Sequence, residues 1–384
     1  MRTACVLLLA LRGLAATPDA SRVLILVNDE VPPSAGTGRK GASVYAGEYY
    51  AEKRGVPKEH ILHLRIPLAC CQHDPLAWDS WHIRWDRFDE TIRKPLLKYL
   101  SAHRLTSEID YIVSAFGIPT TLVNTPSVQN GNGLSVDSFL ASINSGAEAI
   151  GLRNPYHVEK ATDMPPHFRE WSNPAGWKMY LVTRLDGPSV AVATGLVDKA
   201  MRAEKHLKRK DGIAYFDYRH RPCCDAYYEA DQGVMDAYVL STAQDFKSVL
   251  NDQGKTKAMI HDAPETLWAW GWYSGPKTWE GYRFVEGAVG AQLTSYTATN
   301  IRGMAPGAWV PLWLNAGITA TWGATGEPTV RGYARGENLL NHFWMGYNFA
   351  ESSYIASPVL NHKMIFVGDP LYAPEIFRQR PAGR

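Results

Sequence analysis

Apolar runs of β-forming residues recur along this chain of 384 residues, and segments with helical spacing stand between them. The runs RVLILVN (22–28), IDYIVSAFGIP (109–119) and GIAYFDYR (212–219) are largely apolar rather than alternating. Strands of this kind are buried on both faces, and strands that alternate with helices build a mainly parallel sheet. The sequence therefore predicts an α/β fold, with helices on both faces of a mainly parallel sheet.

The remaining elements follow from the same patterns. Residues 17–384 are expected to form a single large α/β domain, with two sub-lobes that divide near 180–210. Helix 85–103 contains Pro95, which we expect to kink or break it. Further helices are predicted at 41–55, 135–144, 188–210, 231–254 and twice within 334–357, and further strands at 61–67, 178–187, 257–263, 266–275, 287–295, 317–325 and 364–368.

The first residues have the layout of a secretory signal. MRTACVLLLALRGLAA has a basic start, a short apolar run and small residues after it, so residues 1–16 are predicted to be a signal peptide and the protein to be exported. No later stretch reaches the ~18 apolar residues of a membrane span. The net charge of +2 gives no field that would favour a nucleic-acid partner.

The sequence contains two pairs of adjacent cysteines, Cys70–Cys71 and Cys223–Cys224. Removal of the signal would also remove Cys5 and leave an even count in an oxidising compartment. Neighbouring cysteines rarely bond to each other, so the interpretation favours disulfides between the two pairs. Both pairs follow a predicted strand, so we expect both at one edge of the sheet. Closing that loop would stabilise the fold by about 4–5 kcal/mol.

A zinc site is the alternative for these sulfurs, because His73 and His220 lie close to the two pairs. Adjacent cysteines suit tetrahedral geometry poorly, and the usual two-residue spacer is absent. The sequence therefore favours disulfides over a metal, and no motif indicates another cofactor.

Several stretches resemble one uncharacterised family of exported bacterial proteins: DYIVSAFGIPT, LVTRLDGPSVAVATGLVDKAMRAEK, AYFDYR, EGAVGAQLTS, AGITATWGATGEP and IFVGDPLYAP. That family is similar, more distantly, to gingipain-type cysteine peptidases with a caspase-like fold. The shared marks are an Arg-Leu turn feeding a helix that runs to Glu204, and a Gly-Asp-Pro near the end, Gly368–Asp369–Pro370.

The resemblance implies a caspase-like sheet in which the catalytic His follows one strand and the catalytic Cys follows the next. The matching stretches here are WGWYSGPKTW and QLTSYTATN, and neither contains His or Cys. The resemblance therefore implies a peptidase homologue without the Cys-His dyad.

A serine-type site is one alternative. Ser295 stands where the nucleophile would be, and His261 beside Asp262 would be its base and orienting carboxylate. Serines at strand ends more often serve as caps or turn residues, which is the structural interpretation of Ser295.

An aromatic crevice is the other predicted feature. Trp268, Trp270 and Trp272 alternate, so they share one face of a strand. They form either a buried core face or, with Tyr273, a stacking platform for a ligand. The predicted binding residues are Trp270, Trp272, Tyr273, Ser274 and Glu327.

Carboxylates near strand ends leave a glycoside hydrolase as an alternative function, since glycoside hydrolysis needs a pair of carboxylates. The candidates are Asp262, Glu280, Glu286, Glu327 and Asp369. The favoured hypothesis is an exported caspase-like peptidase homologue that binds a peptide or polysaccharide, and the alternative is a hydrolase with altered catalytic groups.

Overall fold

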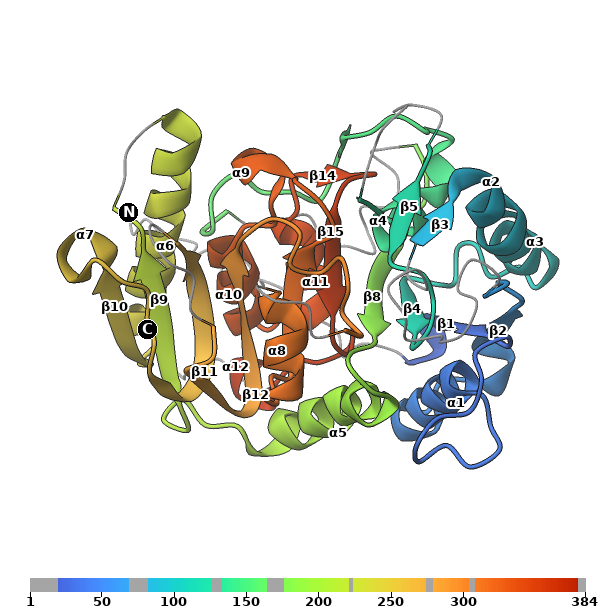
Figure 1. Ribbon diagram of the computed structural model, residues 1–384, viewed down its shortest axis with the longest axis horizontal. Helices are drawn as coiled ribbons and strands as arrows, with labels where there is room; N and C mark the ends of the chain where they lie inside the picture. Colours follow the sequence, from blue (N-terminus) through green and yellow to red (C-terminus); the bar gives the residue numbers. More distant parts are fainter. Residues whose placement is uncertain are drawn as a thin grey trace, which may run out of the picture.

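A ten-stranded sheet crosses the whole molecule in the computed structural model, which describes residues 20–68, 82–125, 133–163, 176–220, 224–273, 279–303 and 308–378 (Figure 1). In spatial order its strands are β10 (Lys247–Asp252), β9 (Ile213–Tyr218), β11 (Ala263–Trp272), β12 (Tyr282–Leu293), β13 (Ala320–Ala324), β15 (Met364–Val367), β8 (Leu181–Leu185), β4 (Tyr111–Ala115), β1 (Val23–Asn28) and β2 (Ile61–Leu64). The central strands β1, β4, β8 and β13 are buried along their full length, which confirms the predicted α/β class.

The sheet consists of two halves of parallel strands with β15 between them. Neighbouring strands from β10 to β13 are parallel, and so are those from β8 to β2. Strand β15 pairs antiparallel with β13, with Thr321 opposite Val367, and meets β8 through the single bridge of Val367 and Arg184. The two halves run in the same direction, because Arg302 after β12 bonds to Asp186 after β8, and Lys199 of the helix that follows β8 reaches the carbonyl of Ile318 before β13.

Helices cover both faces of the β9–β13 half. Phe216 and Trp268 face α6 (Asp225–Ala243) and α10 (Gly336–Trp344). On the other face, Tyr282 lies against Trp313 of α8 (Trp309–Asn315). The other helices are α1 (Ala42–Arg54), α2 (Trp85–Phe88), α3 (Lys94–Ala102), α4 (Val136–Ala141), α5 (Val190–His206), α7 (Gln253–Thr256), α9 (Thr329–Gly332), α11 (Phe349–Ala356) and α12 (Glu375–Arg378).

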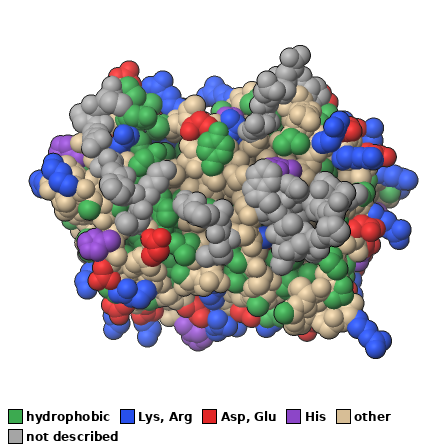
Figure 2. All heavy atoms as spheres, in the orientation of Figure 1, with side chains coloured by type: hydrophobic (Ala, Val, Ile, Leu, Met, Phe, Trp, Pro, Cys, Tyr) green, Lys and Arg blue, Asp and Glu red, His purple; other side chains and the backbone are tan. Residues whose placement is uncertain are grey.

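Five short strands form two smaller sheets. One contains β3 (His82–Arg84), β5 (Thr121–Val123) and β6 (Leu134–Ser135), and the other pairs β7 (Leu152–Arg153) with β14 (Val359–Leu360). Charged side chains of both signs are interspersed around the outline of the molecule in Figure 2. Within the described residues, no helix is both long and apolar enough to cross a bilayer.

Serines cap two helices. Ser135 accepts the N–H of Ser138 at the start of α4, and Ser189 accepts the N–H of Val192 at the start of α5. In the segment 85–103, a π-helical turn at Asp89–Arg93 separates α2 from α3. Pro95 follows this turn, so the regular α-helix is interrupted at the predicted proline.

Two predicted elements differ in the structure. The helix expected over 231–254 ends at Ala243, and Lys247–Asp252 form β10 at one end of the sheet. The strand expected at 257–263 is absent up to Asp262. The backbone N–H of Ile260 instead donates to the buried carboxylate of Asp217, so this segment lies over β9. Edge strands are half exposed, and their mixed composition hides them from a search for apolar runs.

The strand order removes the geometric reason for disulfides between the two cysteine pairs. Cys70–Cys71 follow β2 at one end of the sheet, while Cys223–Cys224 follow β9 next to the other end, eight strand positions away. At ~4.8 Å per strand, the two strands are roughly 38 Å apart. The two pairs therefore follow strands that lie far apart along the carboxyl edge of the sheet. Cys70, Cys71 and Cys223 lie outside the described residues, so the pairing itself stays a prediction; Cys224, at the start of α6, is exposed.

A network of four buried charges joins the two halves. Arg184, at the end of β8, donates to both carboxylate oxygens of Asp137 in α4 at 2.8 Å, and it contacts Asp186 at 3.1 Å. Arg302 reaches Asp186 from the loop after β12 at 2.9 and 2.5 Å. All four residues are at most 5% exposed. Each charge is thus removed from water and depends on its partners.

A second network holds the Gly-Asp-Pro turn. Asp369 accepts hydrogen bonds from Arg54 of α1 and from the hydroxyl of Tyr50, and Arg54 also forms two hydrogen bonds of 2.8 Å with Glu204 of α5. Asp369 also accepts the N–H of Leu371, which fixes a turn after β15. Burial raises the pKa of Asp369, although Arg54 opposes the shift.

Replacing Arg184 by Met should lower the free energy of unfolding by about 3–5 kcal/mol, because Asp137 would remain charged and buried without its main partner. Urea denaturation measures this loss. The matched control is Arg202→Met, which breaks an exposed 2.8 Å pair with Glu286 and should cost less than ~1 kcal/mol. Equal losses in the two variants would contradict the role given to the buried network.

Candidate functional site

A pocket lies at the carboxyl edge of the β9–β13 half. The four strands β9, β11, β12 and β13 run parallel, so the residues that follow them meet at one edge. The pocket encloses about 110 Å³. It is lined by Arg219, Tyr227, Trp272, Tyr273, Leu293, Thr294, Ser295, Glu327, Pro328, Thr329, Val330 and Tyr333.

Arg219 provides the positive charge of this edge pocket. Its guanidinium carbon is 4.4 Å from the ring centroid of Trp272 and 4.6 Å from that of Tyr227. Among the described residues, Arg219 forms no ion pair, and its Nε is buried without a hydrogen-bond partner. The two ring centroids are only 5.2 Å apart, so both rings contact the guanidinium from one side. This contact stabilises the cation and leaves its other side to bind an anion.

Ser295 and Glu327 form the polar side of the pocket. The hydroxyl of Ser295 donates to Oε2 of Glu327 at 2.5 Å, and Oε1 of Glu327 accepts the N–H of Thr329 at 2.8 Å. Tyr296 has a left-handed backbone (φ 62°), and its N–H donates to the carbonyl of Gly326. The loops after β12 and β13 therefore hold each other, and the serine is bonded to a carboxylate rather than to an imidazole.

Thr294 adds an unsatisfied hydroxyl. The residue is 3% exposed, and its Oγ1 has no hydrogen-bond partner among the described residues. A buried hydroxyl without a partner is costly, and it is uncommon in folded proteins.

The alternating tryptophans form a core face. Trp268 and Trp270 are at most 2% exposed. Trp270 lies 5.7 Å from Trp322 between ring centroids, and Trp268 packs on Phe343 of α10. Trp272 is also buried, and its indole N–H donates to Asp231 of α6 at 2.7 Å, but its ring borders the pocket. The structure therefore places Trp270 in the core, away from the pocket, and Trp272 at the pocket wall.

The serine triad suggested by the sequence is not assembled. His261 is exposed and does not line the edge pocket, and Asp262 forms an ion pair of 2.7 Å with Arg283. The segment of His261 is anchored through Ile260 to Asp217, whose pKa is raised to about 6 because burial outweighs its hydrogen bonds. Among the described residues, no hydrogen bond joins His261 to Ser295.

The carboxylates proposed for glycoside chemistry are dispersed. Glu327 lines the pocket, whereas Asp369 belongs to the Arg54 network and Glu286 pairs with Arg202. Glu280 accepts the backbone N–H of Trp279. The described lining of the pocket therefore contains a single carboxylate, that of Glu327.

Of the predicted binding residues, Trp272, Tyr273 and Glu327 come together at the pocket, and Ser274 lies outside the described residues. Arg219, Tyr227 and Thr294 also line this pocket and were not predicted from the sequence. Arg219 follows a predicted strand, so its position at the carboxyl edge was the one signal that could have revealed it.

The described residues form a large α/β protein with a pocket at the carboxyl edge of its sheet. Comparison with solved structures finds two gingipain R chains at 10% identity. One is the complex of Porphyromonas gingivalis RgpB pro- and mature domains (TM-score 0.48, 92% of this chain and 79% of that chain). The other is the Arg-specific cysteine proteinase gingipain R (TM-score 0.47, 93% and 79%). A third, described as a protease, gives a TM-score of 0.42 at 10% identity, with 93% and 79% covered.

The chain is thus distantly similar in structure to gingipain-type cysteine peptidases, and the similarity concerns the fold. No protein-family model matches the chain, and no curated protein matches it.

Replacing Trp270 by Ala should lower the free energy of unfolding by about 3–5 kcal/mol, because the indole is enclosed in the core. Tyr273→Ala, at the half-buried pocket wall, should cost less than half of that. Urea denaturation followed by circular dichroism measures both losses. A small loss in Trp270→Ala would contradict the core assignment.

Proposed function

We propose that the chain is a binding protein for a peptide segment that presents a carboxylate, and that the segment binds at the edge pocket. The observation that carries the proposal is Arg219, packed against Trp272 and Tyr227 and without an ion-pair partner among the described residues. A guanidinium of this kind binds a carboxylate through two parallel hydrogen bonds. The predicted signal at 1–16 supports the further proposal that this binding takes place outside the cytoplasm.

The size and the polar groups of the pocket support a short acidic group as ligand. A volume of about 110 Å³ accommodates one side chain or chain terminus rather than a sugar ring with its neighbours. The buried hydroxyl of Thr294 can donate to such a ligand, and Tyr273 offers a half-buried ring beside it. Because Trp270 lies in the core and Trp272 is buried against Arg219 and Tyr227, the aromatic groups favour a peptide over a polysaccharide.

A serine-type hydrolase is the second candidate, and one observation favours it. The hydrogen bond of 2.5 Å from Ser295 to Glu327 places a carboxylate where a general base would act. However, Glu327 is exposed and already accepts the N–H of Thr329. Among the described residues no imidazole lines the pocket, so binding without turnover is the proposed activity.

Fluorescence polarisation with peptides that contain Asp or Glu, each paired with its Asn or Gln counterpart, tests the binding proposal. Acidic peptides should bind more tightly than their amide counterparts, and Arg219→Ala should weaken them by at least ~10-fold, the value of a charge-assisted hydrogen bond. Arg219→Lys should lose part of that affinity, because an ammonium lacks the planar fork.

The matched control is Arg209→Ala, since Arg209 also stacks on two rings, Phe246 and Phe377, but outside the pocket. It should leave the affinity unchanged. Equal binding of acidic and amide peptides would contradict the proposal. Hydrolysis of peptide esters that is lost in both Ser295→Ala and Glu327→Gln would instead support the hydrolase.

A further inference from the structure

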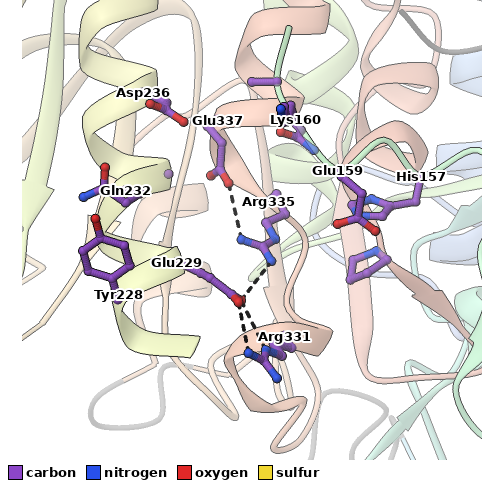
Figure 3. Close-up of a pocket in the computed structure, with 14 residues that line it drawn as sticks. His157, Glu159, Lys160, Tyr228, Glu229, Gln232, Asp236, Arg331, Arg335 and Glu337 are labelled. Atoms are coloured by element: carbon purple, nitrogen blue, oxygen red, sulfur yellow. Dashed lines mark hydrogen bonds and ion pairs between the residues drawn. The ribbon is translucent and has the colours of Figure 1, made fainter. Parts of the chain in front are cut away.

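A second and larger cavity of about 560 Å³ lies between α6, the start of α10 and the segment around residues 157–161 (Figure 3). It is separate from the edge pocket, although both border the first turns of α6. Its walls are dense in ionisable groups: His157, Glu159, Lys160, Glu229, Asp236, Arg331, Arg335 and Glu337.

Glu337 is the most deeply buried carboxylate of this cavity. Its side chain is 8% exposed, and the guanidinium of Arg335 lies 3.8 Å away, beyond hydrogen-bond length. Gly233 of α6 leaves the room that the carboxylate occupies, since a Cβ at this position would lie 2.5 Å from Oε1. The fold therefore brings a carboxylate into a narrow space and leaves it facing the cavity.

A second carboxylate stands next to it. Figure 3 shows Asp236 of α6 and Glu337 of α10 on the same wall of the cavity. Asp236 is exposed, so water screens part of its repulsion of the buried Glu337, and a cation near both carboxylates relieves what remains. Burial raises the pKa of Glu337 to about 6, and the charge of Asp236 contributes to this shift, although Arg335 opposes it.

The lining of the cavity contains one more negatively charged side chain than positively charged ones. Arg331 is bonded to both oxygens of Glu229 at 3.2 and 3.0 Å, and Arg335 is shared between Glu229 and Glu337. The lining contains the four carboxylates of Glu159, Glu229, Asp236 and Glu337, against the three cations of Lys160, Arg331 and Arg335. Burial lowers the pKa of His157, which keeps its ring neutral at pH 7.

A buried hydrogen-bond acceptor without a partner also indicates a ligand that donates hydrogen bonds. Asn338 lines the cavity and is fully buried. Its Nδ2 donates to the carbonyl of Val158 at 2.6 Å, whereas its Oδ1 has no hydrogen-bond partner among the described residues. The cavity lining thus contains a buried acceptor for which the described residues supply no donor.

We infer that this cavity binds a small primary amine, whose ammonium group lies between Glu337 and Asp236. An ammonium offers three N–H donors, which match two carboxylates and a neighbouring amide oxygen. The described residues contain no group of three metal-ligating side chains, and the cavity is far larger than a metal ion. Tyr228, Gln232 and Asn338 suit an amine whose body also forms hydrogen bonds.

Isothermal titration with 4-amino-1-butanol tests the site, with 1,4-butanediol as the neutral counterpart of the same length. The amine should bind and the diol should not. Glu337→Gln and Asp236→Asn should each weaken the amine by about 10-fold or more, because each removes a charge-assisted hydrogen bond. Glu90→Gln, at an exposed carboxylate outside the cavity, should leave the affinity unchanged.

The pH dependence separates Glu337 from its neighbours. Binding should weaken between about pH 7.5 and pH 5, because protonation of Glu337 removes the charge that holds the ammonium. The other groups facing the cavity are Asp236, Glu229, Glu159, Lys160, Arg331, Arg335 and His157, of which His157 gains charge towards low pH. Most of the pH dependence should therefore disappear in Glu337→Gln.

Equal affinity for the amine and the diol, or unchanged affinity in Glu337→Gln, would overturn the inference. Since Arg219 lies outside this cavity, Arg219→Ala should bind the amine normally. The amine site and the acidic-peptide site can therefore fail independently.

Discussion

The buried network of Arg184, Asp137, Asp186 and Arg302 is the interaction on which the arrangement of the two half-sheets depends. Arg184 ends β8 in one half, and its guanidinium also donates to the carbonyls of Ile118 and Pro119. Arg302 brings the loop after β12, in the other half, onto Asp186 and onto the same carbonyl of Ile118. Buried charges tolerate little displacement, so this network fixes the loop that follows Ser295 relative to the opposite half.

The marks of the gingipain-type resemblance are part of this scaffold. Arg184 and Glu204 belong to the two buried networks, and Asp369 closes the turn after β15. None of the three lines the edge pocket. Such residues identify a fold through the contacts that hold it together, and they leave the chemistry of the site open.

The sequence predicted the fold class and most elements because buried strands and amphipathic helices have strong local patterns. It did not predict that β15 runs antiparallel to β13, since a short apolar strand carries no mark of its direction. The pairing of Cys70–Cys71 with Cys223–Cys224 was inferred from one shared edge, but the strand order places β2 and β9 far apart along that edge. Strand β10 was missed because its half-exposed residues resemble a helix end.

The site was predicted only in part, for a related reason. Ser295 and Glu327 each follow a strand, but their contact joins loops that are 32 residues apart in the chain. The sequence offered His261 as the partner of Ser295 because it is the nearest histidine before it in the same third of the chain. Arg219 became significant only when the fold packed Trp272 and Tyr227 against its guanidinium.

The contacts of Arg302 tie the edge pocket to the connections of the other half. The loop after β12 carries both Ser295 and Arg302, and Arg302 bonds to Asp186 after β8 and to the carbonyl of Ile118 after β4. A change of length in the connections after β4 or β8 would therefore displace the rim of the pocket. Insertions are expected to be tolerated best where the loops make no such bond.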